Sequence, residues 1–152
     1  MEESGGYAML MGEFHHSIDD KGRLIIPSKF TDDLGEKFII TRGLDKCLFV
    51  YSQDDWNKVI TKLKTLPFTK ADARNFLRFF LSGAAECEFD RSGRINITSP
   101  LVTYADLKKD CVVIGVNDRL EIWSEEEWNK FFIENSDKLS DMAENLFVET
   151  ED

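Results

Sequence analysis

The chain repeats one short motif, and this repeat limits the folds open to it more than any other feature. The stretch DDKGRLIIPS at residues 19–28 returns as DRSGRINITS at residues 90–99, 71 positions later. A second block, VYSQDDWNK at 50–58, matches IWSEEEWNK at 122–130 at an offset of 72. Two blocks that recur in the same order predict two copies of one half-domain, which differ by one inserted residue.

Each copy carries the pattern of short strands followed by a helix. Four runs rich in β-branched and aromatic residues predict strands, and they lie at residues 38–41, 47–51, 111–116 and 120–123. Ser52 stands three positions before Asp55, and Ser124 stands three positions before Glu127. This is the spacing of a helix-capping box, so a helix is predicted to begin directly after each serine.

Two further helices are predicted outside these blocks. Pro67 ends the helix that follows Ser52, and Thr69 with Asp72 is predicted to begin another that runs to Gly83. Apolar residues at helical spacing predict a weak last helix within residues 136–147.

These features divide the chain into six segments. They are a frayed or tag-like start at 1–11, a first half at 13–55, a helical connector at 56–83, a second half at 84–127, C-terminal helices at 128–147 and a disordered acidic tail at 148–152. Four short strands cannot close a core alone, so the halves are predicted to interleave and cover each other's edges. The predicted fold class is α+β: a small, closed or nearly closed pseudo-twofold β-barrel flanked by helices.

The order of strand, D-x-x-G-R-[LI]-x-I-[PT], helix, strand, hairpin and strand resembles the SpoVT/AbrB-type swapped-hairpin half-barrel, a double-split β-α-β unit. Two such copies in one chain resemble the MraZ family over about residues 12–135. The blocks that carry this resemblance are GEFHHSIDDKGRLIIPSKF, LSGAAECEFDRSGRINI and EIWSEEEW, at 12–30, 81–97 and 121–128. The second copy departs from the stricter pattern at Asn96 and Thr98, where the first has Ile25 and Pro27.

This resemblance implies a bacterial transcriptional regulator, a repressor that binds short direct repeats upstream of the division and cell-wall gene cluster. It also implies a ring-like homo-oligomer that presents D-x-x-x-R turns to double-stranded DNA, with the arginine as the chief contact. In this chain these turns are Asp19 with Arg23 and Asp90 with Arg94. An alternative is that each Asp–Arg pair only braces its turn, and both roles can hold together.

The residues around each pair agree with a DNA-facing turn. Gly22 and Gly93 can supply the positive φ of a tight reversal. Lys21 and Lys29 in the first copy, and Arg91 in the second, are candidate phosphate contacts. A single turn of this kind would bind weakly, whereas several on one rigid assembly gain through effective concentration.

The charge of the chain is unevenly distributed. The formal net charge is −10, yet residues 121–152 carry 11 acidic and 2 basic residues, and residues 1–120 carry 18 and 17. The body is therefore almost neutral and can carry a basic face, while the acidity lies in the C-terminal part. We hypothesise that the acidic tail at residues 136–152 restrains nonspecific DNA binding by repulsion.

The sequence favours neither a metal site nor a membrane span. His15 and His16 are neighbours on a predicted strand, so they point to opposite faces and cannot chelate one ion together. Cys47, Cys87 and Cys111 are scattered without a C-x-x-C pair. No signal peptide and no apolar run of about 20 residues is present, so a cytoplasmic protein is predicted. The resemblance to the MraZ family implies that it is also nucleoid-associated.

No catalytic set or cofactor motif is present, so neither an enzyme nor a cofactor is predicted. The acidic run Glu125–Glu127 is predicted to lie in the first turn of a helix. Trp56 and Trp128 are expected to pack in the core or between the halves. Arg74 and Arg78 share a helix face, and the alternatives for them are DNA contact, pairing with carboxylates of a neighbouring subunit, or solvation, of which the last two together are favoured. The alternative function is an AbrB-like antitoxin or protein-interaction module that uses the acidic tail.

Overall fold

The computed structural model describes residues 9–147 of the chain, which form a mixed α+β fold. The predictions for residues 1–8 and 148–152, a frayed or tag-like start and a disordered acidic tail, lie outside these described residues. The predicted frayed or tag-like start extends to residue 11, but the first strand already begins at Leu10.

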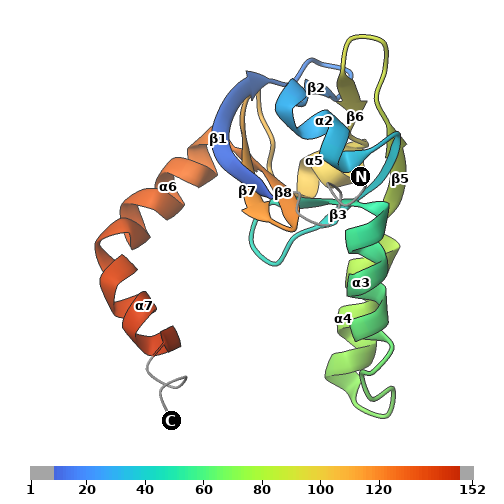
Figure 1. Ribbon diagram of the computed structural model, residues 1–152, viewed down its shortest axis with the longest axis vertical. Helices are drawn as coiled ribbons and strands as arrows, with labels where there is room; N and C mark the ends of the chain where they lie inside the picture. The colour runs from blue at the N-terminus through green and yellow to red at the C-terminus, as the bar shows by residue number, and fades with distance from the viewer. Residues whose placement is uncertain (1–8, 148–152) are drawn as a thin grey trace, which may run out of the picture.

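The elements follow each other in the same order in both copies (Figure 1). The strands in the described part are β1 (Leu10–Ser17), β2 (Arg23–Ile25), β3 (Lys37–Arg42), β4 (Leu48–Ser52), β5 (Ala85–Glu88), β6 (Arg94–Asn96), β7 (Asp110–Asn117) and β8 (Arg119–Ser124). The helices are α2 (Ser28–Leu34), α3 (Gln53–Leu63), α4 (Ala71–Ser82), α5 (Ser99–Tyr104), α6 (Glu125–Asn135) and α7 (Leu139–Phe147), with a 3-10 turn η1 (Ser136–Lys138) before α7. Two strands, a helix, two strands and a helix therefore occur twice, as the repeat predicts.

The two copies exchange strands, which confirms the predicted interleaving. Six antiparallel strands form one sheet in the order β1-β7-β8-β4-β3-β5. β1 of the first copy pairs with β7 of the second, and β5 of the second copy pairs with β3 of the first. Neither half can form its share of the sheet without the other, so the whole repeat folds as one unit.

Equivalent residues face each other at two places, and these mark a pseudo-twofold axis. Leu24 of β2 lies opposite Ile95 of β6, and the two stand 71 positions apart. Phe49 of β4 lies opposite Glu121 of β8, 72 positions apart. The axis therefore passes through the β2–β6 pair and through the centre of the six-stranded sheet.

A closed barrel is not what these strands form. Within residues 9–147, β1 and β5 are the edges of the six-stranded sheet, and β2 pairs with β6 as a separate two-stranded ribbon. β2 and β6 are only three residues long, and each pairs with the other along its whole length. A single bridge between Ile18 and Leu24 joins the ribbon to the end of β1. The predicted α+β class holds, but the barrel stays open.

The sheet is covered on both faces by apolar side chains. On one face, the ribbon and helices α2 and α5 enclose a core in which Leu24, Phe38 and Ile95 are completely buried. On the other face, Trp56 of α3 and Trp128 of α6 pack against a second cluster, as predicted for a core role. The two-stranded ribbon, whose strands begin at Arg23 and Arg94, is therefore anchored in the main core.

The helix ends follow the predicted caps at two of three places. The Ser52 hydroxyl accepts the backbone N–H of Asp55 at 3.2 Å, and the Ser124 hydroxyl accepts that of Glu127 at 3.0 Å. The acidic run 125–127 lies in the first turn of α6, as predicted. α4 ends at Gly83 as expected, but it begins after Lys70 without a side-chain cap and not at Thr69. The weak last helix is confirmed as α7.

Two helical extensions leave the body on different sides (Figure 1). α3 and α4 lie side by side and form a hairpin (residues 53–82), in which the ring of Phe80 stacks on Trp56 and Phe76 at 5.7 and 5.4 Å. α6, η1 and α7 form an arm (residues 125–147) that extends away from the sheet. Arg74 donates to the carbonyl of Phe68 within the hairpin.

His15 of β1 ties the arm to the sheet. Its Nδ1 lies 2.9 Å from a carboxylate oxygen of Glu125, and its Nε2 lies 2.8 Å from one of Glu13. A neutral imidazole has a single N–H, and carboxylates only accept, so holding both contacts requires the imidazolium. At the place related by the pseudo-twofold axis, the Gln53 amide at the start of α3 donates to Glu86 of β5 at 3.0 Å. The arm is therefore joined to the sheet by a titratable side chain, His15, whereas the hairpin is joined to it by the uncharged amide of Gln53.

We predict that the arm contact weakens as the pH rises. The hydrogen bonds that the His15 imidazole donates to Glu13 and then to Glu125 raise its pKa above 6.5. A group with a raised pKa in the folded state stabilises the fold fully below its unfolded pKa, here 6.5. This contribution to the free energy of unfolding is lost as the pH rises through the raised pKa. The urea midpoint of the protein should therefore fall more between about pH 6 and about pH 9 than that of His15→Gln, which keeps a donor but does not titrate. Equal pH dependence in both proteins would contradict this.

Candidate nucleic-acid interface

The first turn (Asp19–Arg23) is held by the carboxylate of Asp19. One oxygen accepts the backbone N–H groups of Lys21 and Arg23, each at 2.9 Å. The other oxygen accepts Nε–H of the Arg23 side chain at 2.7 Å. The backbone closes the turn through bonds from Asp19 to Arg23 and from Gly22 to Asp19, both at 3.0 Å. One side chain thus fixes both the backbone of the turn and the direction of its arginine.

The second turn (Asp90–Arg94) repeats this geometry. The Asp90 carboxylate accepts the N–H groups of Ser92 and Arg94 at 2.8 and 2.9 Å, and its second oxygen accepts Nε–H of Arg94 at 2.9 Å. Asn96 and Thr98 depart from the first copy's pattern, yet they do not alter the turn.

Both turns depend on a glycine in the left-handed region, but their surroundings differ. Gly22 has a φ of +83° and Gly93 has a φ of +77°. A Cβ atom at Gly22 would lie 2.4 Å from the carbonyl oxygen of Ile97, whereas one at Gly93 would meet nothing within 4 Å. The first turn is therefore packed against the body, and the second is free on that side.

The two turns lie next to each other because β2 pairs with β6. Nη1 of Arg94 approaches the Asp19 carboxylate to 4.0 Å. The side chains of Arg23 and Arg94 remain 37% and 30% exposed. Within residues 9–147, the Nη groups of Arg23 have no hydrogen-bond partner. Two guanidinium groups, each fixed through Nε, therefore lie on a common surface and still offer Nη donors.

Hydrogen bonding keeps both turn carboxylates charged. The backbone N–H of Arg23 is the main cause that lowers the pKa of Asp19, opposed by desolvation and helped by the Arg23 side chain and the N–H of Lys21. The pKa of Asp90 is lowered in the same way, chiefly by the backbone N–H of Arg94. At neutral pH each aspartate is therefore ionised and can hold its arginine in place.

The other predicted contacts are distributed around these turns. Lys21 and Arg91 lie within the first and second turns and are exposed. Lys29 lies on α2, where its ammonium sits 5.3 and 5.5 Å from the ring centres of Phe14 and Phe30. The structure thus places Lys21 and Arg91 beside the arginines and gives Lys29 a cation–π contact on a helix.

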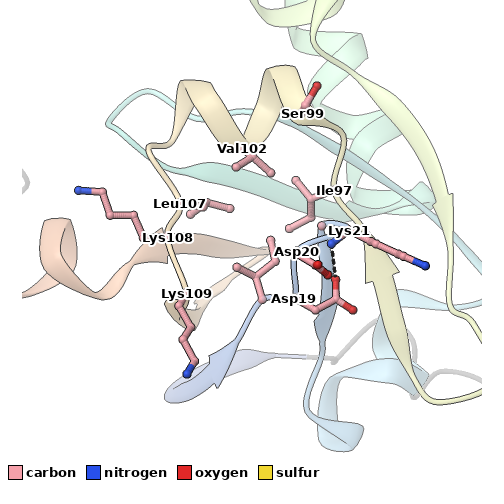
Figure 2. Close-up of a pocket in the computed structure, with 11 residues that line it drawn as sticks. Asp19, Asp20, Lys21, Ile97, Ser99, Val102, Leu107, Lys108 and Lys109 are labelled. Carbon is pink, nitrogen blue, oxygen red and sulfur yellow. Dashed lines mark hydrogen bonds between the residues drawn. The ribbon is translucent and has the colours of Figure 1, made fainter.

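A hollow adjoins the first turn, and no sequence pattern pointed to it. It measures about 660 Å³ and lies between the first turn and the loop from α5 to β7; we refer to it as the first-turn hollow. Figure 2 shows Lys108 and Lys109 of that loop at its rim, across from Lys21. These two lysines lie near the first turn because β1 pairs with β7. They are more than 80 positions away from it in the sequence, so the sequence alone does not predict this proximity.

The described residues offer no metal site. No group of three or more metal-binding side chains occurs between residues 9 and 147. His15 contacts carboxylates of two different elements, and Cys47 and Cys111 are buried. Between residues 9 and 147, we also find no helix with the length and hydropathy of a transmembrane span.

A comparison with protein families agrees with the repeat. A family model described as "MraZ protein, putative antitoxin-like" matches this chain twice, over residues 9–79 and 80–150. The two matches follow each other directly and together span almost the whole chain. Each contains one Asp–Arg turn, one hairpin of strands and one capped helix.

Proposed function

We propose that this chain, which belongs to the MraZ family, is a sequence-specific DNA-binding regulator of transcription. It would act as a repressor of the division and cell-wall gene cluster and bind short direct repeats upstream of its own operon. The observation that carries this proposal is the pair of matched Asp–Arg turns, set side by side with their arginines braced and partly exposed.

The geometry of each turn suits recognition of DNA. A guanidinium fixed through Nε still offers its Nη donors, which can hold a phosphate or the O6/N7 edge of a guanine in a bidentate manner. Because the aspartate restricts the arginine before DNA arrives, little side-chain freedom is lost on binding. Lys21 and Arg91 extend from the same turns and would add phosphate contacts without reading sequence.

Assembly of several chains would strengthen this contact, and the helical extensions favour it. The arm exposes large apolar side chains, among them Ile133, Leu139 and Leu146, which are about 70% or more accessible. The arm carries seven acidic and two basic residues, whereas the hairpin carries six basic and three acidic. Exposed apolar surface with opposite charges at two ends favours contact between copies, and we propose a homo-oligomeric ring.

The proposal is tested by footprinting the gene's own upstream region with the purified full chain, together with its mass in solution. We expect protection of short repeated sites by an oligomer, and binding that weakens steeply with added salt, since each phosphate contact releases counterions. Uniform, weak binding to any DNA, or a monomer that protects no site, would overturn it.

A second candidate function is a protein-interaction module of the antitoxin type. It is favoured by the acidic arm with its exposed apolar residues and by the description of the matching family. Deleting residues 136–152 separates the two functions. Loss of a co-purifying protein partner would support the module, whereas increased affinity for random DNA would support an acidic segment that restrains a DNA-binding body.

A further inference from the structure

The first-turn hollow has the size and lining of a ligand site. Figure 2 shows Ile97, Val102 and Leu107 toward its centre, with the first turn on one side and α5 on the other. Ile18, at the end of β1, adds a further apolar side chain. A concave volume of some hundreds of cubic ångströms with an apolar centre and polar groups around it is typical of small-molecule sites.

The second half of the repeat shows what kind of group fits this corner. Phe89 stands 71 positions after Ile18 and also lies between a sheet strand and its turn. Its ring packs on Phe38 with 4.6 Å between ring centres. Phe38 lies opposite Cys87 in the sheet, and Cys111 lies opposite His16, which is the equivalent of Cys87 in the first copy. In the first-turn corner, Cys111 therefore takes the place of the Phe38 ring. The protein fills one corner with aromatic rings and leaves the other with smaller side chains.

The rim of the hollow favours an anion. The lysines at positions 21, 108 and 109 line it together with Asp19 and Asp20, and Figure 2 shows their ammonium groups turned outward from its apolar centre. Asp19 is already engaged by Arg23, and Lys108 is paired with Glu126 at 3.1 Å. Within residues 9–147, the ammonium groups of Lys21 and Lys109 have no ion pair, and their flexible stems let them turn toward a bound anion.

We infer that the first-turn hollow binds a flat aromatic anion, such as an aromatic carboxylate, and that this ligand weakens DNA binding by the adjacent turn. The ring would occupy the apolar centre, and its carboxylate would meet Lys21 or Lys109. A negative charge there would repel the DNA phosphates and occupy Lys21. The effect on DNA rests on the proposed function, whereas binding of the ligand does not.

Binding is tested on the full chain by NMR titration with 2-naphthoate, beside the neutral 2-naphthalenemethanol. We expect saturable shifts at residues 18–22 and 97–109, with contacts from the ring to the methyl groups of Val102 and Leu107. Lys109→Gln should weaken naphthoate binding about three- to fivefold, the strength of one exposed ion pair. The neutral compound should bind more weakly than naphthoate.

Ile18 supplies matched variants because the second half has already replaced it. Ile18→Phe copies Phe89 and should remove naphthoate binding while the fold is kept, and Ile18→Leu should retain it. Shifts that stay unchanged in Ile18→Phe, or that fall outside the hollow, overturn the site. If Ile18→Phe does not fold, the ring-to-methyl contacts in the unchanged protein decide the question alone.

The regulatory part has a separate readout. Naphthoate should weaken binding of the protein to its own upstream DNA, and this effect should be absent in Ile18→Phe. If the protein binds no specific DNA, the proposed function fails while the titration still decides the site. If naphthoate binds in the hollow and DNA affinity is unchanged, the coupling is overturned and the site stands.

Discussion

Replacing Arg23 and Arg94 together by alanine is expected to abolish specific binding of the protein to its own upstream DNA. Each arginine that reads a guanine contributes about 1–3 kcal/mol, so a single replacement should weaken binding by about 5- to 150-fold. The losses multiply when one assembly engages several sites at once. A gel-shift titration at fixed salt, with specific and random DNA, measures both changes.

Two controls separate contact from charge and from folding. Lys46→Ala removes one positive charge from the loop between β3 and β4, where its ammonium lies 3.8 Å from Glu127, and should leave specific binding nearly unchanged. Arg23→Lys keeps the charge of the first turn but loses the planar fork, so it should retain nonspecific affinity and lose specificity. Full retention of specific binding by the double alanine variant would remove the arginines from the mechanism.

Replacing Gly22 by alanine should destabilise the protein much more than the same change at Gly93. Both glycines have a positive φ, which costs an alanine about 1–2 kcal/mol. At Gly22 the new methyl group would also clash with the carbonyl oxygen of Ile97, at 2.4 Å. The turn must then move and strain the 2.7 Å bond from the Ile97 N–H to the Gly22 carbonyl. We expect a loss of about 3 kcal/mol for Gly22→Ala and about 1–2 kcal/mol for Gly93→Ala.

Urea unfolding of both variants at one protein concentration measures this difference. The two positions are equivalent in the repeat, so each serves as the control for the other. Equal losses would show that backbone conformation alone sets the cost. A larger loss at Gly93 would contradict the prediction that the clash with Ile97 adds to the cost at Gly22.

The features that the sequence predicts well are those encoded within a few positions. The turn from Asp19 to Arg23, and the caps at Ser52 and Ser124, depend on side chains that bond to backbone three or four residues away. The exchange of strands was predictable because a half-domain of short strands leaves edges that only its other copy can cover.

The remaining features depend on contacts between distant residues. The three-residue strands β2 and β6 decide whether the barrel closes. They form hydrogen bonds with each other and leave the edges of the large sheet unpaired. The contact of His15 with Glu125 spans 110 positions, and it exists only because α6 begins beside β1. Lys109 reaches the first turn for a similar reason, since its carbonyl accepts the N–H of Ile18 where β7 begins.

Phe49 and Glu121 lie opposite each other across the axis, and this pair favours joining both halves in a single polypeptide. Glu121 is buried, and its carboxylate accepts from Trp123 at 3.0 Å and from Arg119 at 2.8 Å, while the Arg119 guanidinium lies 4.4 Å from the ring centre of Phe49. Two separate, identical half-chains would have to bring two such carboxylates together at this point, where like charges repel in a poorly solvated interior. In a covalently fused duplication the two halves can differ, so an acid can lie opposite an aromatic ring at a position that a true dimer must fill with the same residue twice.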